Sequence, residues 1–212
     1  MHNRGVLRRL AICLSAVVLA GCASGGGAAT VSPKPSELLP DAGNGHYAGI
    51  GLDPAQPRPS FTLTDTSGTK FAFRQTSGHP TFLFFGYTNC PDVCPATMAN
   101  IRLALHQVPK ALQRKTYVVF VTTDIKRDTG PVLARWLRNF TPGIVAKMIG
   151  LRGTQEEIDA AQAASHIPLA EDDGQQHSAL VLLYGADDYA RVEYAQSNNQ
   201  PKLMAHDLPL VG

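Results

Sequence analysis

The chain has 212 residues, of which 19 are Lys or Arg and 17 are Asp or Glu, so its formal net charge is +2. This balance excludes proteins that bind nucleic acid through a strongly basic surface. The only long apolar run, Leu10–Ala20, is too short to cross a bilayer as a helix.

The first 22 residues are typical of a bacterial lipoprotein signal. Three arginines precede the apolar run, which ends in Leu-Ala-Gly-Cys22 and resembles a lipobox, in which cleavage precedes a cysteine that carries lipid. We therefore expect a signal peptide over residues 1–21, lipidation of Cys22, and a lipid-anchored protein of the bacterial cell envelope that faces the periplasm. The alternative is that Cys22 is merely a small residue near an ordinary cleavage site. The exported chain keeps 16 basic and 17 acidic residues and is formally −1.

The exported chain divides into two parts by composition. Residues 22–59 are rich in Gly, Ala, Ser and Pro without a sustained period, which predicts a flexible tether. Residues 60–212, about 150 in number, are enough for one domain with a real core.

The first elements of this domain are predicted from periodicity. Alternating apolar residues around a Ser-Gly turn predict a hairpin over 61–73, and a continuous apolar run predicts a strand buried on both faces over 81–87. From Pro95 the period becomes helical, with Met98, Ile101 and Leu105 on one face.

The later elements alternate in type. We expect a strand at 117–123, a helix opening at 129–131, a short strand at 147–151, a helix from the Thr154–Glu157 capping box to about Ala164, a hairpin of strands 178–184 and 189–195, and a last helix at 201–208. This order predicts an α/β fold with a central mixed sheet and helices on its faces.

Cys90 and Cys94 are the only cysteines left for thiol chemistry, because Cys13 leaves with the signal and Cys22 takes the lipid. They lie between the predicted strand 81–87 and the helix from 95, where functional loops gather in such sheets. Residues four apart on a helix face the same way, about 5–6 Å apart, and a helix N-terminus favours thiolate. The two sulfurs can therefore converge.

Three interpretations of the pair remain open. A structural disulfide would close a very small loop and stabilise the fold little. A redox dithiol, in which one cysteine attacks and the other resolves, usually has two intervening residues, and here there are three. A metal site needs a further ligand; two soft thiolates select Cu(I), with zinc as the competitor.

His177 is the candidate third ligand. It ends the polar loop 171–177 directly before the predicted strand 178–184, so that the loop can hang over the cysteines. We expect the remaining histidines of the exported chain to be ordinary surface residues, and Asp92 to cap the helix or contact a partner. Those histidines are His46, His79, His106, His166 and His206.

The segments FFGYTNCPDVCPATM, VTTDIKRDTGPVLARWLRNF and QHSALVLLYGADD resemble the Sco/SenC family of membrane-anchored copper proteins that assemble cytochrome c oxidase. The resemblance covers about Pro59 to Tyr194. It implies a thioredoxin-like three-layer sandwich with an N-terminal hairpin extension, in which Cys90, Cys94 and His177 bind one copper ion. Gln176 departs from the family, in which an aspartate is expected before the histidine. Asp124 matches the family's second motif and is expected to support the site.

The resemblance also implies the function. We expect a copper chaperone, rather than an enzyme with turnover, that serves the copper-bearing subunit of cytochrome c oxidase or another periplasmic copper protein. Two thiolates and an imidazole suit trigonal Cu(I), whereas Cu(II) would need a fourth donor. A thiol reductant protein must keep the cysteines reduced, because a Cys90–Cys94 disulfide cannot bind copper. The alternative is a thiol:disulfide oxidoreductase without a copper role.

Overall fold

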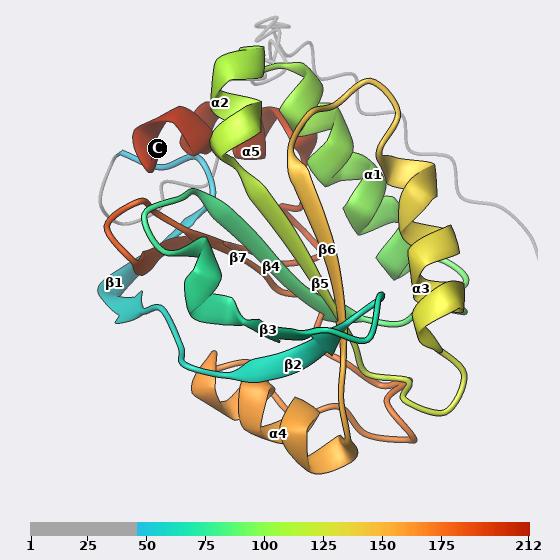
Figure 1. The fold of residues 1–212 in the computed structure, drawn as a ribbon. Coiled ribbons are helices and arrows are strands. Elements are labelled where there is room, and N and C mark those ends of the chain that lie inside the picture. The colour runs from blue at the N-terminus through green and yellow to red at the C-terminus, as the bar shows by residue number, and fades with distance from the viewer. Residues whose placement is uncertain (1–45) are drawn as a thin grey trace, which may run out of the picture. The chain divides into compact units, whose positions relative to one another are not determined.

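A computed structural model describes residues 46–212 of the chain (Figure 1). The predicted signal peptide, Cys22 and the start of the predicted tether lie outside these residues. The strands are β1 (Ile50–Pro57), β2 (Thr62–Asp65), β3 (Lys70–Ala72), β4 (Thr81–Gly86), β5 (Tyr117–Thr122), β6 (Lys147–Arg152), β7 (Val181–Tyr184) and β8 (Tyr189–Tyr194). The α-helices are α1 (Val93–His106), α2 (Lys110–Lys115), α3 (Gly130–Leu137), α4 (Gln155–Ala164) and α5 (Pro201–Asp207).

The strands form one mixed sheet in the order β1-β8-β7-β4-β5-β6-β2-β3. The pairs β4–β5 and β5–β6 are parallel, and the remaining pairs are antiparallel. The predicted hairpin is confirmed as β2 and β3, which extend the sheet beyond β6. The mixed sheet expected from the order of elements is therefore confirmed.

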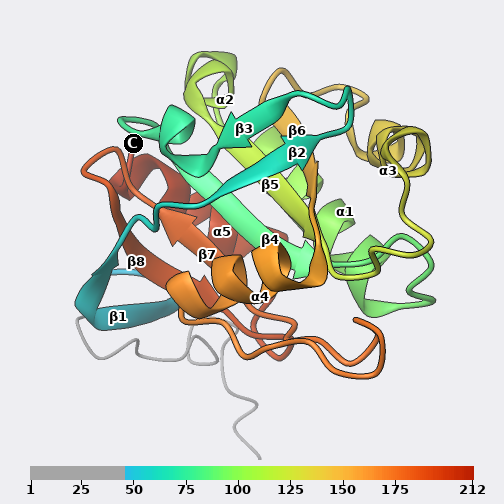
Figure 2. The ribbon, with the colours of Figure 1, turned by 60° about the horizontal axis from the view of Figure 1, so that its bottom comes forward.

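The central strands are buried on both faces, as their continuous apolar runs predict. Along β4, Phe82 and Phe84 belong to one core, which includes residues of α1, α3 and α5, and Leu83 and Phe85 belong to the other, which includes residues of α4. Figure 2 shows α4 lying across the second face of the sheet. The result is three layers, with the sheet in the middle, as in the predicted sandwich.

The predicted tether is wrong at its C-terminal end. Residues 50–57 form β1, which pairs with β8 at the edge of the sheet. Just before it, the N–H groups of Ala48 and Gly49 donate to the buried carboxylate of Asp207 at 2.7 and 2.8 Å. A strand rich in Pro and Gly shows no clear period, because only one of its edges is paired and its burial is partial. The domain therefore begins before residue 60.

Two other boundaries differ from the predictions. Helix α1 begins at Val93, two residues before Pro95, so that Cys94 lies within its first turn. Strand β7 begins at Val181 rather than 178, so that His177 lies four residues before the strand rather than next to it. Between residues 46 and 212, no helix combines the length and the apolar character that crossing a membrane requires.

Candidate metal centre

The first turn of α1 places the two cysteines together. Cys94 is fully buried, and Cys90 is partly exposed in the loop that follows β4. The N–H of Cys94 donates to the sulfur of Cys90 at 3.4 Å. Asp92 stands at the N-cap position, but its side chain makes no capping hydrogen bond, so the prediction that it caps the helix is wrong. The sulfur of Cys90 accepts one of the N–H groups left free at this helix end.

The two thiols differ in acidity. Burial alone would raise the pKa of Cys90, but hydrogen bonds from the backbone of Cys94 and Asp92 and from the side chains of Cys94 and Tyr87 bring the pKa below its ordinary value. Burial raises the pKa of Cys94 far above its ordinary value, although a backbone hydrogen bond at Tyr87 opposes this. Cys90 is thus the readier thiolate, and Cys94 must lose its proton before its sulfur can bind a metal or attack a disulfide.

His177 lies beside the cysteine pair. Its Nε2 is 3.3 Å from the sulfur of Cys94, and its Nδ1 donates to the carbonyl of Ser178 at 2.9 Å. The ring also packs edge-on against Phe84 and Tyr87, with centroids 6.0 and 5.5 Å away. Burial lowers the pKa of His177. The ring is therefore held neutral, with the nitrogen that can bind a metal turned toward the sulfur.

The ring of His177 is oriented by the carbonyl of Ser178, and position 176 is occupied by Gln176 rather than an acid. Metal-binding histidines usually donate their other ring N–H to a carboxylate or a carbonyl, which fixes the ring. Here the backbone of the next residue does this. No sequence signal could have revealed it, because every residue carries a carbonyl.

The three ligand atoms converge, as the sequence predicted. The two sulfurs and one ring nitrogen all lie within 4.8 Å of one another. An ion with bonds of about 2.0–2.3 Å to three ligands at the corners of a triangle would separate those ligands by about 3.5–4 Å. The donor set therefore fits one ion after small side-chain adjustments. Within residues 46–212, no other group of three such ligands lies this close together.

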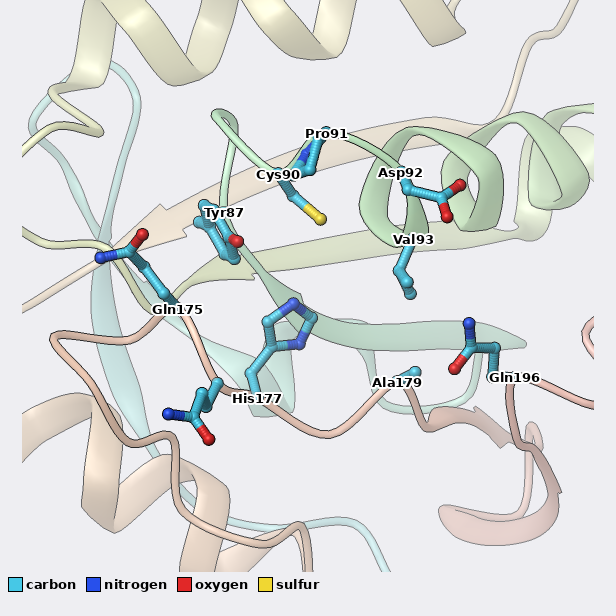
Figure 3. Close-up of a pocket in the computed structure, with 10 residues that line it drawn as sticks. Tyr87, Cys90, Pro91, Asp92, Val93, Gln175, His177, Ala179 and Gln196 are labelled. Carbon is cyan, nitrogen blue, oxygen red and sulfur yellow. The ribbon is translucent and has the colours of Figure 1, made fainter. Parts of the chain in front are cut away.

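The site opens to solvent through a pocket of about 300 Å³ (Figure 3). In the figure, the sulfur of Cys90 and the ring of His177 point toward one another across it, and Tyr87 stands beside them. Pro91, Val93, Ala179 and Gln196 complete much of the wall. Cys94 is fully buried and does not line the pocket. Two of the three candidate ligands, Cys90 and His177, are thus accessible from the pocket.

Asp124 does not contact this centre directly. Its buried carboxylate accepts hydrogen bonds from the backbone and the side chain of Arg127, and none of its hydrogen bonds reaches Cys90, Cys94 or His177. The expected support by Asp124 is therefore not through a direct hydrogen bond to a ligand.

Asp128 supports the cysteine loop, a role that the sequence analysis missed. Its fully buried carboxylate accepts the N–H of Thr88 at 2.9 Å and the hydroxyls of Thr88 and Thr122 at 2.5 Å each. Thr88 lies two residues before Cys90. The available signal was the segment 124–129, which contains both Asp124 and Asp128 without showing which of the two reaches the loop.

Comparisons with known proteins show the family of this chain. The SCO1/SenC family model matches residues 51–209. A putative copper-binding protein of Stutzerimonas stutzeri is 31% identical over 63% of this chain and 66% of its own length, and the protein SenC of Rhodobacter capsulatus is 39% identical over 55% and 50%. The chain thus spans about half to two thirds of these relatives. The structure of Bradyrhizobium japonicum ScoI with copper bound matches with a TM-score of 0.61 and 29% identity, over 74% of this chain and 99% of the other. The chain belongs to the SCO1/SenC family.

Proposed function

We propose that the protein is a copper chaperone that binds one Cu(I) ion through Cys90, Cys94 and His177. The observation that carries the proposal is the convergence of two sulfurs and one ring nitrogen within 4.8 Å. The copper-binding names of relatives and the copper-bound ScoI structure support the choice of ion.

The donor set favours Cu(I) over Zn(II). Soft thiolates suit Cu(I), which accepts three ligands, whereas structural zinc sites are almost always closed by four. Within residues 46–212 the cluster offers three. A zinc ion bound here would have to take its fourth ligand from the solvent in the pocket.

Copper is cargo in this proposal. Cys90 and His177 line the pocket and can exchange with the ligands of a partner, while the buried Cys94 retains the ion until the transfer is complete. We propose the copper-bearing subunit of cytochrome c oxidase as the recipient, or another periplasmic copper protein. Membership of the SCO1/SenC family supports this partner.

The proposal includes attachment to the membrane. Residues 1–21 would be removed and Cys22 would carry lipid, so that the domain faces the periplasm. The sequence pattern around Leu-Ala-Gly-Cys22 supports this part. Substitution of Cys22 by Ala should release the protein from the membrane fraction of expressing cells, and a variant that stays in that fraction would contradict lipid anchoring.

The metal site is tested by titrating the reduced domain with Cu(I) in competition with a Cu(I) chelator. The wild type should take up one ion per chain, and Cys90→Ser and Cys94→Ser should lose that uptake. His177→Ala should bind at least about 10-fold more weakly, as expected for loss of one ligand. Stoichiometric uptake with the same affinity in His177→Ala would exclude the imidazole from the site.

A second candidate function, thiol:disulfide reduction, is favoured by the unequal thiols. The Cys90 thiolate would attack a disulfide of a partner and form a mixed disulfide. Cys94 would then lose its proton and attack the sulfur of Cys90, releasing the partner as a dithiol and leaving a Cys90–Cys94 disulfide. A thiol reductant protein would restore the pair. His177→Ala should retain this activity, which separates it from copper binding.

A further inference from the structure

The loop that carries His177 is attached to the domain at one buried glycine. Gly174 lies three residues before His177, is buried, and has a φ of +85°, which L side chains rarely adopt. The neighbouring Asp172 and Asp173 also have positive φ values, of 51° and 52°. The backbone of this loop is therefore bent to bring Gly174 inward.

Gly174 meets Thr123, which directly follows β5. The hydroxyl of Thr123 donates to the carbonyl of Gly174 at 2.6 Å. A Cβ at Gly174 would lie 1.9 Å from the carbonyl oxygen of Thr123 and 2.4 Å from its carbonyl carbon. Because these are backbone atoms, they cannot rotate out of the way as a flexible side chain would. Any side chain at position 174 must push the loop outward by about 1 Å, which exceeds the tolerance of about 0.5 Å expected for such sites.

Thr123 is also connected to Cys94, through Gly86. Its N–H donates to the carbonyl of Gly86 at 2.8 Å, at the end of β4. Gly86 in turn packs against Cys94, since a Cβ at Gly86 would lie 2.7 Å from that sulfur. Contacts therefore run without interruption from the His177 loop through Thr123 and Gly86 to Cys94.

The other contacts of this loop do not hold it firmly to the rest of the domain. Lys126 and Asp173 form an ion pair at 2.8 Å, but their side chains are 67% and 64% exposed, and such surface pairs contribute little. The bridge between Glu171 and Gln176 closes the loop on itself. After His177, the chain is next fixed by sheet pairing at Val181, opposite Phe84. The histidine thus sits between two attachments, three residues after one and four before the other.

We propose that Gly174 and Thr123 are positioning residues for the metal centre: their contact sets the place of His177 relative to the two sulfurs. This inference rests on the proposed role of His177 as a copper ligand. Neither residue touches the ion. Both act by keeping the imidazole close enough to bind it.

The test compares Gly174→Ala with Gly68→Ala in the reduced domain. Gly68 has a similar φ of +91° and no atom within 4 Å of an added Cβ, so its variant carries the same backbone penalty without the steric overlap. We expect Gly174→Ala to lower Cu(I) affinity about 10- to 100-fold, the range typical for groups that orient a metal ligand. Gly68→Ala should keep the affinity of the wild type.

A second pair of variants covers the case in which Gly174→Ala fails to fold. Thr123→Val has nearly the same shape but cannot donate to the carbonyl of Gly174, whereas Thr123→Ser can. We expect Thr123→Val to weaken Cu(I) binding and Thr123→Ser to restore it. Wild-type affinity in both Gly174→Ala and Thr123→Val would overturn the proposal.

The same variants made in a His177→Ala background separate positioning from general damage. If the contact between Gly174 and Thr123 acts through His177, then Gly174→Ala and Thr123→Val should cause no further loss of Cu(I) affinity in the His177→Ala background. An equal loss of Cu(I) affinity in the wild-type and His177→Ala backgrounds would overturn the proposal. The substitutions would then disturb the sulfurs or the fold rather than the position of His177. If His177→Ala itself binds Cu(I) like the wild type, the proposed metal centre fails, and the positioning role fails with it.

Discussion

Asp128→Ala tests whether one buried carboxylate holds both the fold and the cysteine loop. The variant leaves three donors without an acceptor: the partly buried N–H and hydroxyl of Thr88 and the buried hydroxyl of Thr122. Hydrogen bonds to a charged group contribute about 1.5–3 kcal/mol each, but losses within one network do not add. Leaving a buried donor unsatisfied costs about 1–3 kcal/mol, and three donors lose their shared acceptor here, so the total should be about 3 kcal/mol once non-additivity is allowed for. We expect the free energy of unfolding to fall by about that amount.

The matched control is Asp65→Ala. The carboxylate of Asp65 also accepts three hydrogen bonds, from the N–H and hydroxyl of Ser67 and the N–H of Thr69, at 2.6–3.0 Å, but in an exposed turn. Water can replace the lost partner there, so we expect a cost below about 1.5 kcal/mol. Urea unfolding followed by circular dichroism measures both variants. Equal losses in the two would refute the argument from burial.

Asp128→Ala should also disturb copper binding. Thr88 lies two residues before Cys90, so its release lets the loop that carries the first sulfur move. We expect Cu(I) affinity to fall about 10-fold or more in this variant and to stay unchanged in Asp65→Ala. A destabilised Asp128→Ala protein with wild-type copper affinity would show that the carboxylate serves stability alone.

Three further predictions follow from the geometry of the centre. With each cysteine left alone by a Cys→Ser change in the other, iodoacetamide should alkylate Cys90 at least about 10-fold faster than Cys94 at pH 8, because Cys90 is more exposed and more acidic; equal rates would contradict this. Burial lowers the pKa of His177 from its ordinary 6.5, so below pH 6.5 the unfolded state binds more protons than the folded state, and the stability of the metal-free protein should fall as the pH drops through that window. Urea unfolding at several pH values should show this component in the wild type and not in His177→Ala. Gly86→Ala places a methyl group 2.7 Å from the sulfur of Cys94 and should cost about 1–3 kcal/mol by overpacking; an unchanged unfolding midpoint would refute the close contact.

The sequence predicts the central part of the fold well, for a physical reason. Strands β4 and β5 are buried on both faces, so their apolar runs are unbroken. The capping box of α4 can be recognised directly in the sequence. Strand β1 gave no such signal, since it lies at an edge and is half exposed. It pairs with β8, and the two residues just before it are held by Asp207, 158 or 159 positions away along the chain, which no local pattern can show.

The candidate site could likewise be predicted only in part from the sequence. Cys90 and Cys94 could be predicted from their thiol chemistry and their spacing, and His177 from its place in a loop before a strand. The contacts that orient these residues are carried by backbone atoms or by long-range partners: the carbonyl of Ser178 and the contact of Gly174 with Thr123. Such contacts depend on how the loops meet in space. They become visible only in the folded structure.

The most direct test of the account is X-ray absorption spectroscopy of the reduced domain loaded with one Cu(I) per chain. We predict two sulfur ligands and one nitrogen ligand, at distances of about 2.0–2.3 Å. The nitrogen contribution should disappear in His177→Ala. A copper ion bound by sulfur alone in the wild type would contradict the proposed centre.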